Sequence, residues 1–535
     1  MSMDPSNRRV LLLLADLLAL ALLFLALELP NRVEWINAQS LRFLPVELMA
    51  IGLLLLVPGR WGRAVRTALS LLLALGLVFK VGDLIVYQVF SRQFNPVFDL
   101  YLIDDGLRVV IGAFGSWHAV LLVLAVLAIF ALIVVLSYVL LERFRHLLSH
   151  WPRWSALALA AVLALWLALK LAGVARVNSY FTDVLLDHAR AIATSVADMR
   201  SFGAVVNADS TTAIGNDRLL AKLRGKDVLV VFVEAYGRTA FDHPEHEGLI
   251  RPLLDDANFQ LGLNGQQARS AWLTSPTVGG LSWLAHGTLL SGLWINDQPR
   301  YDTLLMSQRP TLNKLFQRAG FRTVGVMPQI IQPWPEGKYF GYDQLYPAAE
   351  LGYQGLPFGW ISMPDQYTLA YFQARERSAK SHRNLMAQIV LVSSHTPWAP
   401  LPQVIKWSDI KDGHEFDEQT KTGPDVDAVW EDPAKIREQY RTSIAYDLNT
   451  LISYAINFGG DDLVMLIVGD HQPLPIASDY SDAREVPVHL IAGDKAVLDA
   501  IDDWHWSQGL IPADDAPVWR MDALRDRFIQ AFSQP

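Results

Sequence analysis

Residues 228–237 read VLVVFVEAYG and residues 462–471 read DLVMLIVGDH, and these two stretches decide the fold. Each is a near-continuous aliphatic run of strand length that ends in polar residues. Such a run is typical of a strand buried on both faces of a parallel sheet. Three further runs share the pattern: FRTVGVM at 321–327, AQIVLVSSH at 387–395 and VPVHLIAG at 486–493. Helical intervals at 309–320 and 436–459 separate them, so we predict an α/β domain with a largely parallel sheet over residues 227–535.

Polar residues follow three of these predicted strands. Glu234 ends the first run, His395 follows another, and Asp470 and His471 end the run at 462–471. Taken singly, such residues fit a helix cap or a hydrogen-bonded core group. Sites in open α/β sheets lie at the carboxyl ends of strands, where these side chains would meet. Because two carboxylates and an imidazole offer O, O and N ligands, we predict that Glu234, Asp470 and His471 hold a divalent metal.

A hydroxyl-rich stretch, LTSPTVGGLSWLAHGTLLSG, occupies residues 273–292. Pro276 and the pair Gly279–Gly280 predict a tight entry into a helix that begins at about Leu281. The N-terminus of a helix presents free N–H groups and a positive dipole to an anion. A hydroxyl in this stretch could therefore face a phosphate, although an ordinary helix cap is the alternative.

The first 175 residues have the composition of a membrane domain. Overall, 52% of the 535 residues are hydrophobic and only 19% are charged. Each of five apolar stretches approaches the ~20 residues that a ~30 Å hydrocarbon core requires. They lie at about 10–30, 41–58, 67–90, 117–141 and 154–175. The second contains Pro45 and Glu47, so a re-entrant or tilted segment is the alternative there.

Basic residues predict the orientation of the spans. They lie before the first span, between the second and third, and between the fourth and fifth: Arg8, Arg9, Arg60, Arg63, Arg66, Arg143, Arg145 and Arg153. The positive-inside rule places these alternate loops in the cytoplasm and everything after the fifth span outside.

Lys80 and Asp83 lie inside the third span and are spaced to neutralise each other. Pairing with Glu47 and a role in lipid entry are alternatives. Residues 176–226 are predicted as a connector with an interfacial helix, or a plain linker helix.

Charge and cysteine content exclude several classes of function. The first 175 residues carry 14 Lys and Arg against 10 Asp and Glu, so the total of −9 leaves −13 for residues 176–535. An acidic domain without clustered basic residues argues against nucleic acid as a partner. The chain has no cysteine, which excludes disulfides, thiolate metal sites and cysteine nucleophiles.

The order of motifs resembles the sulfatase-like catalytic domain of lipoteichoic acid synthases and related phosphoglycerol transferases, in the alkaline phosphatase superfamily. The resemblance covers nearly the whole chain, including the five preceding spans. It rests on Glu234, Thr277 in PTVGGLSW, Gly341–Tyr342–Asp343, His395 in SSHTPW, Tyr446–Asp447 and GDHQP at 469–473.

This resemblance implies a metal shell of Glu234, Thr277, Asp470 and His471. Thr277 would also be the nucleophile, with Thr274, Ser275 and Ser282 as nearby alternatives, and His395 would contact the phosphate group. A threonine hydroxyl is too basic to attack at neutral pH, so coordination to a cation would supply its activation. One divalent ion is expected, with manganese favoured over zinc or magnesium. Trp334 is expected to contact the substrate, although the tryptophan-plus-arginine arrangement of the family is not evident there.

The implied function is transfer of a phosphoglycerol-type head group at the outer face of a bacterial cytoplasmic membrane. Phosphatidylglycerol would be the donor and a glycan or lipid the acceptor, through a phosphothreonine intermediate. A phosphoethanolamine transferase is the nearest alternative, although those enzymes usually carry disulfides. A sulfatase, a two-metal phosphatase or phosphodiesterase, and a non-catalytic module that binds envelope polymers are further alternatives.

Overall fold

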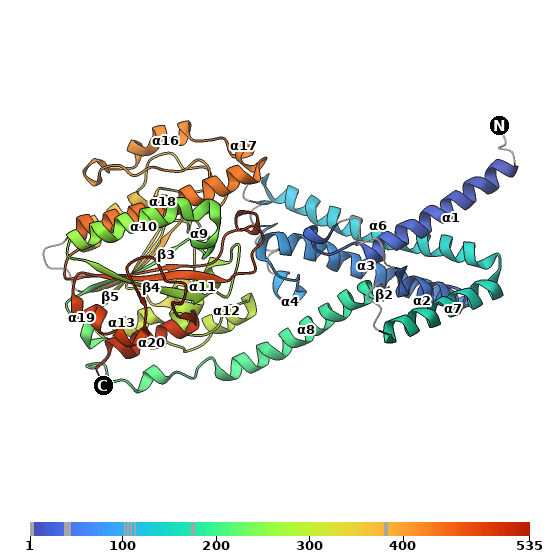
Figure 1. Ribbon diagram of the computed structural model, residues 1–535, viewed down its shortest axis with the longest axis horizontal. Coiled ribbons are helices and arrows are strands. Elements are labelled where there is room, and N and C mark those ends of the chain that lie inside the picture. The colour runs from blue at the N-terminus through green and yellow to red at the C-terminus, as the bar shows by residue number, and fades with distance from the viewer. Residues whose placement is uncertain are drawn as a thin grey trace. The chain divides into compact units, whose positions relative to one another are not determined.

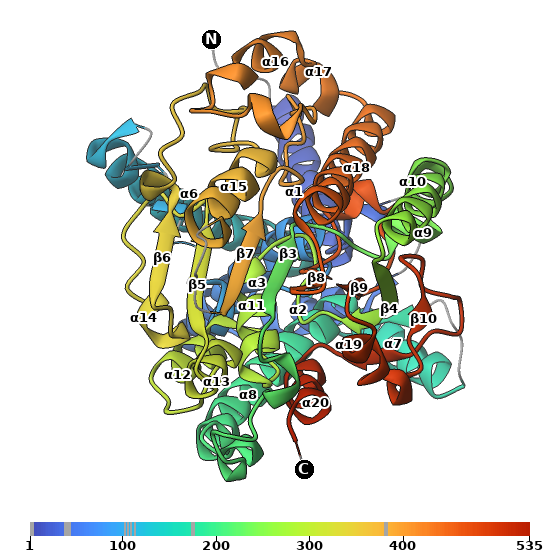
Figure 2. The same ribbon diagram turned by 90° about the vertical axis from the view of Figure 1, so that its left-hand side faces the viewer.

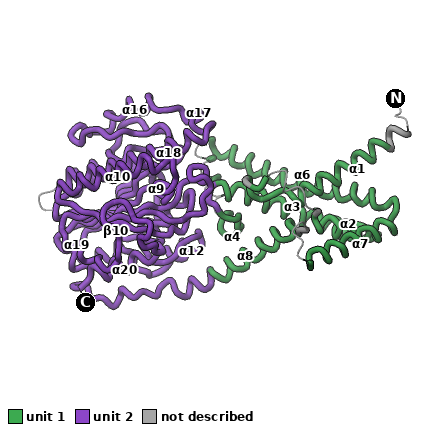
Figure 3. The backbone as a smooth tube through the Cα atoms, viewed as in Figure 1, with its two compact units in different colours: residues 1–88, 92–198 green, residues 89–91, 199–535 purple. Residues whose placement is uncertain are grey.

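The computed structural model describes residues 5–36, 44–100, 103, 106–107, 110–111, 114–172, 177–378 and 384–534. It contains two compact units (Figure 3). The helical unit comprises residues 1–88 and 92–198, and the α/β unit comprises residues 89–91 and 199–535. Each unit has its own apolar core and is described by itself.

The helical unit contains the apolar segments of the chain. Its elements are α1 Pro5–Glu28, β1 Leu44–Pro45, α2 Val46–Leu55, α3 Gly59–Phe90, α4 Pro96–Asp99, α6 Ser116–Ser149, α7 Pro152–Leu171, β2 Val177–Asn178 and the first part of α8 Tyr180–Val205 (Figure 1). Among the described residues, four stretches are long and apolar enough to cross a membrane: Val10–Glu28, α3, α6 and α7. The predicted apolar helical bundle is therefore confirmed. Residues 173–175 of the last expected span, and residue 176 of the connector, lie outside the described residues.

The second expected span is shorter than a membrane crossing requires. Residues 41–43 lie outside the described residues, and α2 has ten residues. Ten helical residues rise about 15 Å, half of a ~30 Å hydrocarbon core. The helix begins directly after Pro45, and its Glu47 accepts a hydrogen bond from the backbone N–H of Thr182 at 2.9 Å. α2 by itself is therefore shorter than the expected full span, and the re-entrant or tilted segment stays an alternative.

Lys80 and Asp83 of α3 are buried and have separate partners. Lys80 Nζ donates to the backbone carbonyls of Ala26 and Leu27, at 3.1 and 2.7 Å. Asp83 accepts hydrogen bonds from the Asn31 side chain and the Phe94 backbone, and its carboxylate lies 3.2 Å from His188 Nε2. These contacts tie α3 to the end of α1 and to α8.

The α/β unit is built on one mixed sheet. Its strands are β3 Asp227–Val233, β4 Gln267–Thr274, β5 Arg322–Met327, β6 Gln344–Pro347, β7 Leu385–Leu391, β8 Leu463–Gly469, β9 Glu485–Ala492, β10 Ser507–Gln508 and β11 Val518–Arg520. The order is β10-β4-β9-β8-β3-β7-β5-β6, with β11 beside β4. Strands β8, β3, β7, β5 and β6 run parallel, whereas β9 is antiparallel to both neighbours. The predicted α/β domain with a largely parallel sheet is confirmed.

Helices cover both faces of this sheet (Figures 1 and 2). One apolar core includes residues of α10 Pro244–Leu263, α15 Asp365–Phe372 and α18 Pro433–Phe458. The other includes residues of α11 Ser282–Ser291, α13 Leu312–Arg318 and α20 Asp522–Phe532. Shorter helices are α9 Thr239–Asp242, α12 Gln298–Leu305, α14 Gly337–Phe340, α16 Asp417–Thr422, α17 Val426–Trp430 and α19 Lys495–Asp499. Because the central strands are covered on both sides, β3 and β8 are buried along their whole length.

The strand register brings the polar strand ends together. Val233 of β3 pairs with Gly469 of β8 and with Leu391 of β7. The residues that follow each strand therefore leave the sheet side by side at its carboxyl edge. This edge is where a site is expected in such a sheet.

Candidate metal centre

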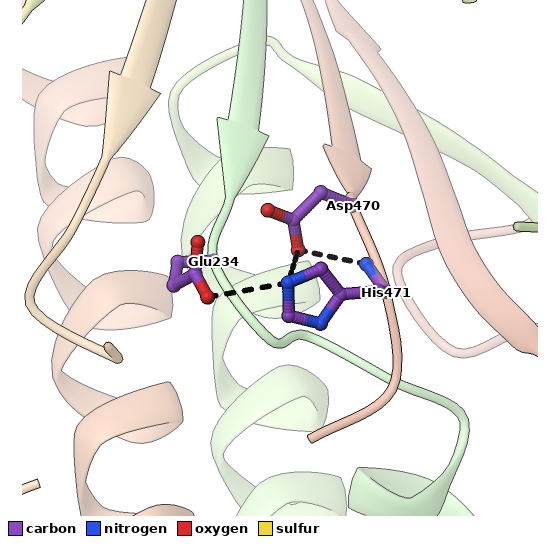
Figure 4. Close-up of side chains that lie close together, drawn as sticks. All are labelled: Glu234, Asp470 and His471. Atoms are coloured by element: carbon purple, nitrogen blue, oxygen red, sulfur yellow. Dashed lines mark hydrogen bonds and ion pairs between the residues drawn. The ribbon is translucent and has the colours of Figure 1, made fainter. Parts of the chain in front are cut away.

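Glu234, Asp470 and His471 form a buried cluster at this edge (Figure 4). One ligand atom from each lies within 4.8 Å of the others. His471 Nε2 is 3.3 Å from Glu234 Oε1 and 3.7 Å from Asp470 Oδ1. The relative exposure of the three residues is 7%, 0% and 1%, respectively. Three of the four predicted metal-shell residues are thus adjacent, and they offer two carboxylates and one imidazole.

The hydrogen bonds of the cluster leave ligand atoms free. His471 Nδ1 lies 2.8 Å from the Gln472 carbonyl, so Nδ1–H donates there and Nε2 keeps its lone pair in the neutral ring. Metal-binding histidines characteristically donate their second N–H in this way. Asp470 Oδ1 accepts from the backbone N–H groups of Ala235 and His471 at 2.9 and 2.7 Å. Asp470 Oδ2 is buried and has no hydrogen-bond partner among the described residues. The donor set therefore fits a divalent cation.

The carboxylates of Glu234 and Asp470 stabilise a positive charge beside them. Although burial acts to lower it, the pKa of His471 rises to about 9 because of the carboxylates of Asp470 and Glu234. Burial and the nearby Glu234 charge raise the pKa of Asp470 to about 8. The pKa of Glu234 is lowered despite its burial, chiefly by the charge of His471. A cation that replaced the His471 proton would relieve the repulsion between the two carboxylates.

Ser282 contacts two side chains of the cluster through its hydroxyl. It is the first residue of α11, and its Oγ lies 2.9 Å from Glu234 Oε2 and 3.1 Å from His471 Nε2. The chain enters α11 through three residues with positive φ, Gly279, Gly280 and Leu281. Glycine adopts this conformation without strain, which explains the Gly-Gly pair before the helix. Sequence reasoning placed Ser282 among the alternatives to Thr277.

Thr277 lies on the loop that leads to this helix. The bridge between Val278 and Gln472 is parallel and aligns Thr277 with His471 along the two chains. Ser275 Oγ donates to the Asp470 carbonyl at 2.6 Å and holds the start of the loop. Thr277 Oγ1 is buried and has no hydrogen-bond partner among the described residues. Thr277 therefore offers a second hydroxyl on the loop next to the cluster.

His395 and Trp334 follow two other parallel strands. His395 comes after β7 and is partly exposed; its Nδ1–H donates to the Thr396 carbonyl at 2.5 Å, which leaves Nε2 free. Its charge contributes to the lowered pKa of Glu234, which places it beside the cluster. Trp334 comes after β5, and its indole stacks on Phe340 with ring centroids 5.6 Å apart. Its aromatic partners, Phe340 and Tyr342, thus belong to its own segment.

His286 of α11 is a site residue that sequence reasoning missed. It lies one turn after Ser282, with Nε2 3.9 Å from Asp470 Oδ2. Burial lowers the pKa of His286 to about 3, so its ring is neutral. The spacing of Ser282 and His286, four residues apart, places both side chains on one face of a helix and could have identified the pair. His489, which is also buried, bonds Tyr236 and Ser270 and is a core residue.

Comparison by sequence gives no match to any protein-family model or curated protein. Comparison of the fold finds similar solved structures. Lipoteichoic acid synthase LtaP from Listeria monocytogenes is 15% identical over 58% of this chain and 72% of that chain, with a TM-score of 0.35. Phosphoglycerol transferase GacH from Streptococcus pyogenes is 11% identical over 62% and 80%, with a TM-score of 0.38. The periplasmic domain of EcEptC from Escherichia coli, in complex with Zn, is 13% identical over 58% and 82%, with a TM-score of 0.37.

Proposed function

We propose that this chain is a membrane-anchored, metal-dependent phosphotransferase. It moves a phosphoglycerol-type head group from phosphatidylglycerol to a glycan or lipid acceptor outside the cytoplasm. The observation that carries the proposal is the contact of the Ser282 hydroxyl with Glu234 and His471, two members of the buried cluster. A hydroxyl at the start of a helix, beside two carboxylates and an imidazole, suits a phosphoryl transfer through a covalent intermediate.

In the first half-reaction, a serine or threonine oxygen attacks the phosphorus of the donor. The new O–P bond replaces the bond to diacylglycerol, which leaves with its oxygen. Ser282 is favoured as nucleophile because its Oγ–H already points at Glu234 Oε2, which can take the proton. A divalent ion bound by Glu234, Asp470 and His471 would lower the pKa of the hydroxyl and offset charge on the phosphoryl oxygens. Manganese is favoured, and zinc or magnesium also suits these donors.

Thr277 keeps a role as the second hydroxyl in this proposal. Its Oγ1, which is buried and has no hydrogen-bond partner in the described part of the chain, could complete the metal shell or replace Ser282 as nucleophile. His395, with a free Nε2, would contact the phosphate and donate a proton to the leaving oxygen of diacylglycerol when its ring is protonated. Trp334 would contact the substrate. In the second half-reaction an acceptor hydroxyl attacks the phosphorus, and the protein oxygen leaves.

The apolar helices explain how such an enzyme would reach a lipid donor. The basic residues before Val10–Glu28, at the start of α3, at the end of α6 and at the start of α7 favour a cytoplasmic location for those ends. With those ends in the cytoplasm, the segment that contains α2 would complete a crossing between α1 and α3, and the α/β unit would then work at the outer face of a bacterial cytoplasmic membrane. Anchoring would keep it close to the lipids from which it takes the head group.

The test is release of diacylglycerol from fluorescent lipids by the full chain in detergent. Phosphatidylglycerol and phosphatidylethanolamine are assayed separately, each with and without Mn²⁺. Ser282→Ala is compared with Thr277→Ala, and Ser307→Ala, on an unrelated turn, is the control. We expect Mn²⁺-dependent release from phosphatidylglycerol that is lost in Ser282→Ala and retained in the control.

Other outcomes reassign parts of the proposal. Release from phosphatidylethanolamine alone would make the chain a phosphoethanolamine transferase. Loss of release in Thr277→Ala with activity retained in Ser282→Ala would move the nucleophile to Thr277. Mass spectrometry of protein quenched during turnover would identify the phosphorylated residue directly. Absence of release from either lipid would sink the phospholipid-donor proposal.

A further inference from the structure

His286 and Asp470 face each other with unpaired atoms. His286 Nε2 and Asp470 Oδ2 are 3.9 Å apart, and both atoms are buried without a hydrogen-bond partner among the described residues. The other carboxylate oxygen, Oδ1, already accepts two backbone N–H groups. The ring of His286 packs against Phe232 of β3 with centroids 4.1 Å apart. His286 is therefore held beside a free carboxylate oxygen without bonding to it.

Leaving two complementary polar atoms buried and unpaired is costly, so the arrangement indicates a second state in which they pair. The separation exceeds a hydrogen bond by less than 1 Å, which a small rotation of either side chain would close. The ligand atoms of Glu234, Asp470 and His471 all lie within 4.8 Å of one another, and His286 does not belong to this group. His286 is therefore more than 4.8 Å from at least one of the three ligand atoms. Two ligands of one ion, each about 2.1 Å from it, are at most ~4.2 Å apart. This geometry makes His286 a partner of a metal ligand and not a ligand itself.

We propose that His286 is a positioning residue of the metal centre. When the centre is loaded, His286 Nε2–H donates a hydrogen bond to Asp470 Oδ2 and fixes the rotation of that carboxylate. The inference rests on the proposed metal site and is independent of the substrate and of the transfer reaction. Because Ser282 and His286 lie on the same helix, α11 would carry both the hydroxyl that contacts the cluster and the group that orients Asp470.

The test is binding of Mn²⁺ to the full chain in detergent, followed by the electron paramagnetic resonance signal of free Mn²⁺. His286→Phe keeps a ring against Phe232 but removes the N–H. We expect it to weaken Mn²⁺ binding by about 10–100-fold, the usual effect of losing a hydrogen bond to a metal ligand. His286→Gln keeps an N–H donor and should stay within about threefold of the unmodified chain. His246→Gln, at another buried histidine, should leave the affinity unchanged.

A second measurement separates hydrogen bonding from direct coordination. Electron spin echo spectroscopy of the Mn²⁺ complex counts coordinated imidazole nitrogens, and we expect one, from His471, in the unmodified chain and in His286→Gln. A second nitrogen that disappears in His286→Gln would make His286 a ligand and overturn the proposal. Unchanged Mn²⁺ affinity in His286→Phe would also overturn it. Thermal melts confirm that each variant is folded, and His286→Leu replaces His286→Phe if the latter is not.

Discussion

Removing the metal should make the stability of the α/β unit fall as pH rises from about 6.5 to 9.5. Despite burial, the charges of Asp470 and Glu234 raise the pKa of His471 from 6.5 to about 9 in the folded, metal-free protein. A histidine with a raised pKa contributes stability that is fully present below pH 6.5 and is lost as pH rises through 9. At 1.36 kcal/mol per pKa unit, the loss is about 3 kcal/mol. In a unit of this size it corresponds to a melting temperature lower by about 5 °C.

Thermal melts of the chelator-treated chain at half-unit pH steps measure this loss. The pKa of Asp470, raised to about 8 by burial and by Glu234, acts in the same direction up to that pH. His471→Gln removes the imidazole and should flatten the curve between about pH 8 and 9.5, where His471 is the one member of the cluster that still titrates. With Mn²⁺ bound the trend should vanish or reverse, because the ion replaces protons and binds more tightly as pH rises. A metal-free melting temperature that stays constant or rises over this range would refute the electrostatic account of the cluster.

Three further perturbations test other parts of the structure. Glu234→Gln removes a charged ligand and should weaken Mn²⁺ binding by about 100-fold or more; an unchanged affinity, measured by the free Mn²⁺ signal, would place the ion elsewhere. Asp209→Asn removes the buried carboxylate that lies 3.0 Å from Arg525 and 3.4 Å from Arg309. It should lower the free energy of unfolding by about 3–5 kcal/mol, seen as a lower melting temperature of the α/β unit, and a smaller change would mean that the arginines find other partners. Lys80→Met leaves two carbonyl groups of α1 unpaired and should destabilise the helical unit by about 1–3 kcal/mol in detergent melts. A more stable Lys80→Met protein would favour a functional role for this lysine.

The strands and the three cluster residues are predictable because both follow from local pattern. A run such as residues 228–237 is too apolar for any exposed position, so it must be a central strand, and the polar residue that ends it must lie at the sheet edge. Register then aligns Glu234 with Asp470 without further information. The sequence pattern does not predict that β9 runs antiparallel to its neighbours, since its residues are as aliphatic as those of the parallel strands.

The sequence does not decide which hydroxyl meets the cluster. Thr277 and Ser282 are five residues apart, one before and one after the Gly279–Gly280 turn, and the sequence alone allows either hydroxyl to face the cluster. The choice depends on positive φ angles at Gly279, Gly280 and Leu281, which turn the chain so that Ser282 begins α11 beside Glu234. A positive φ at leucine is rare, so pattern reasoning does not anticipate it. The length of α2 was also not predictable, because hydropathy does not show at which residue an apolar helix begins.

The unpaired atoms of this region have a common explanation. Thr277 Oγ1, Asp470 Oδ2 and His286 Nε2 are all buried without hydrogen-bond partners among the described residues, although folded proteins pair nearly all such atoms. The three belong to the loop, the strand end and the helix that surround one cluster. A bound cation would engage the carboxylate and draw His286 toward it, and a phosphoryl group would bring oxygen atoms to the threonine hydroxyl. The same site thus has the ligands for a metal, a hydroxyl already oriented by two of them, and vacant hydrogen-bonding capacity, which together favour a transferase over a binding module.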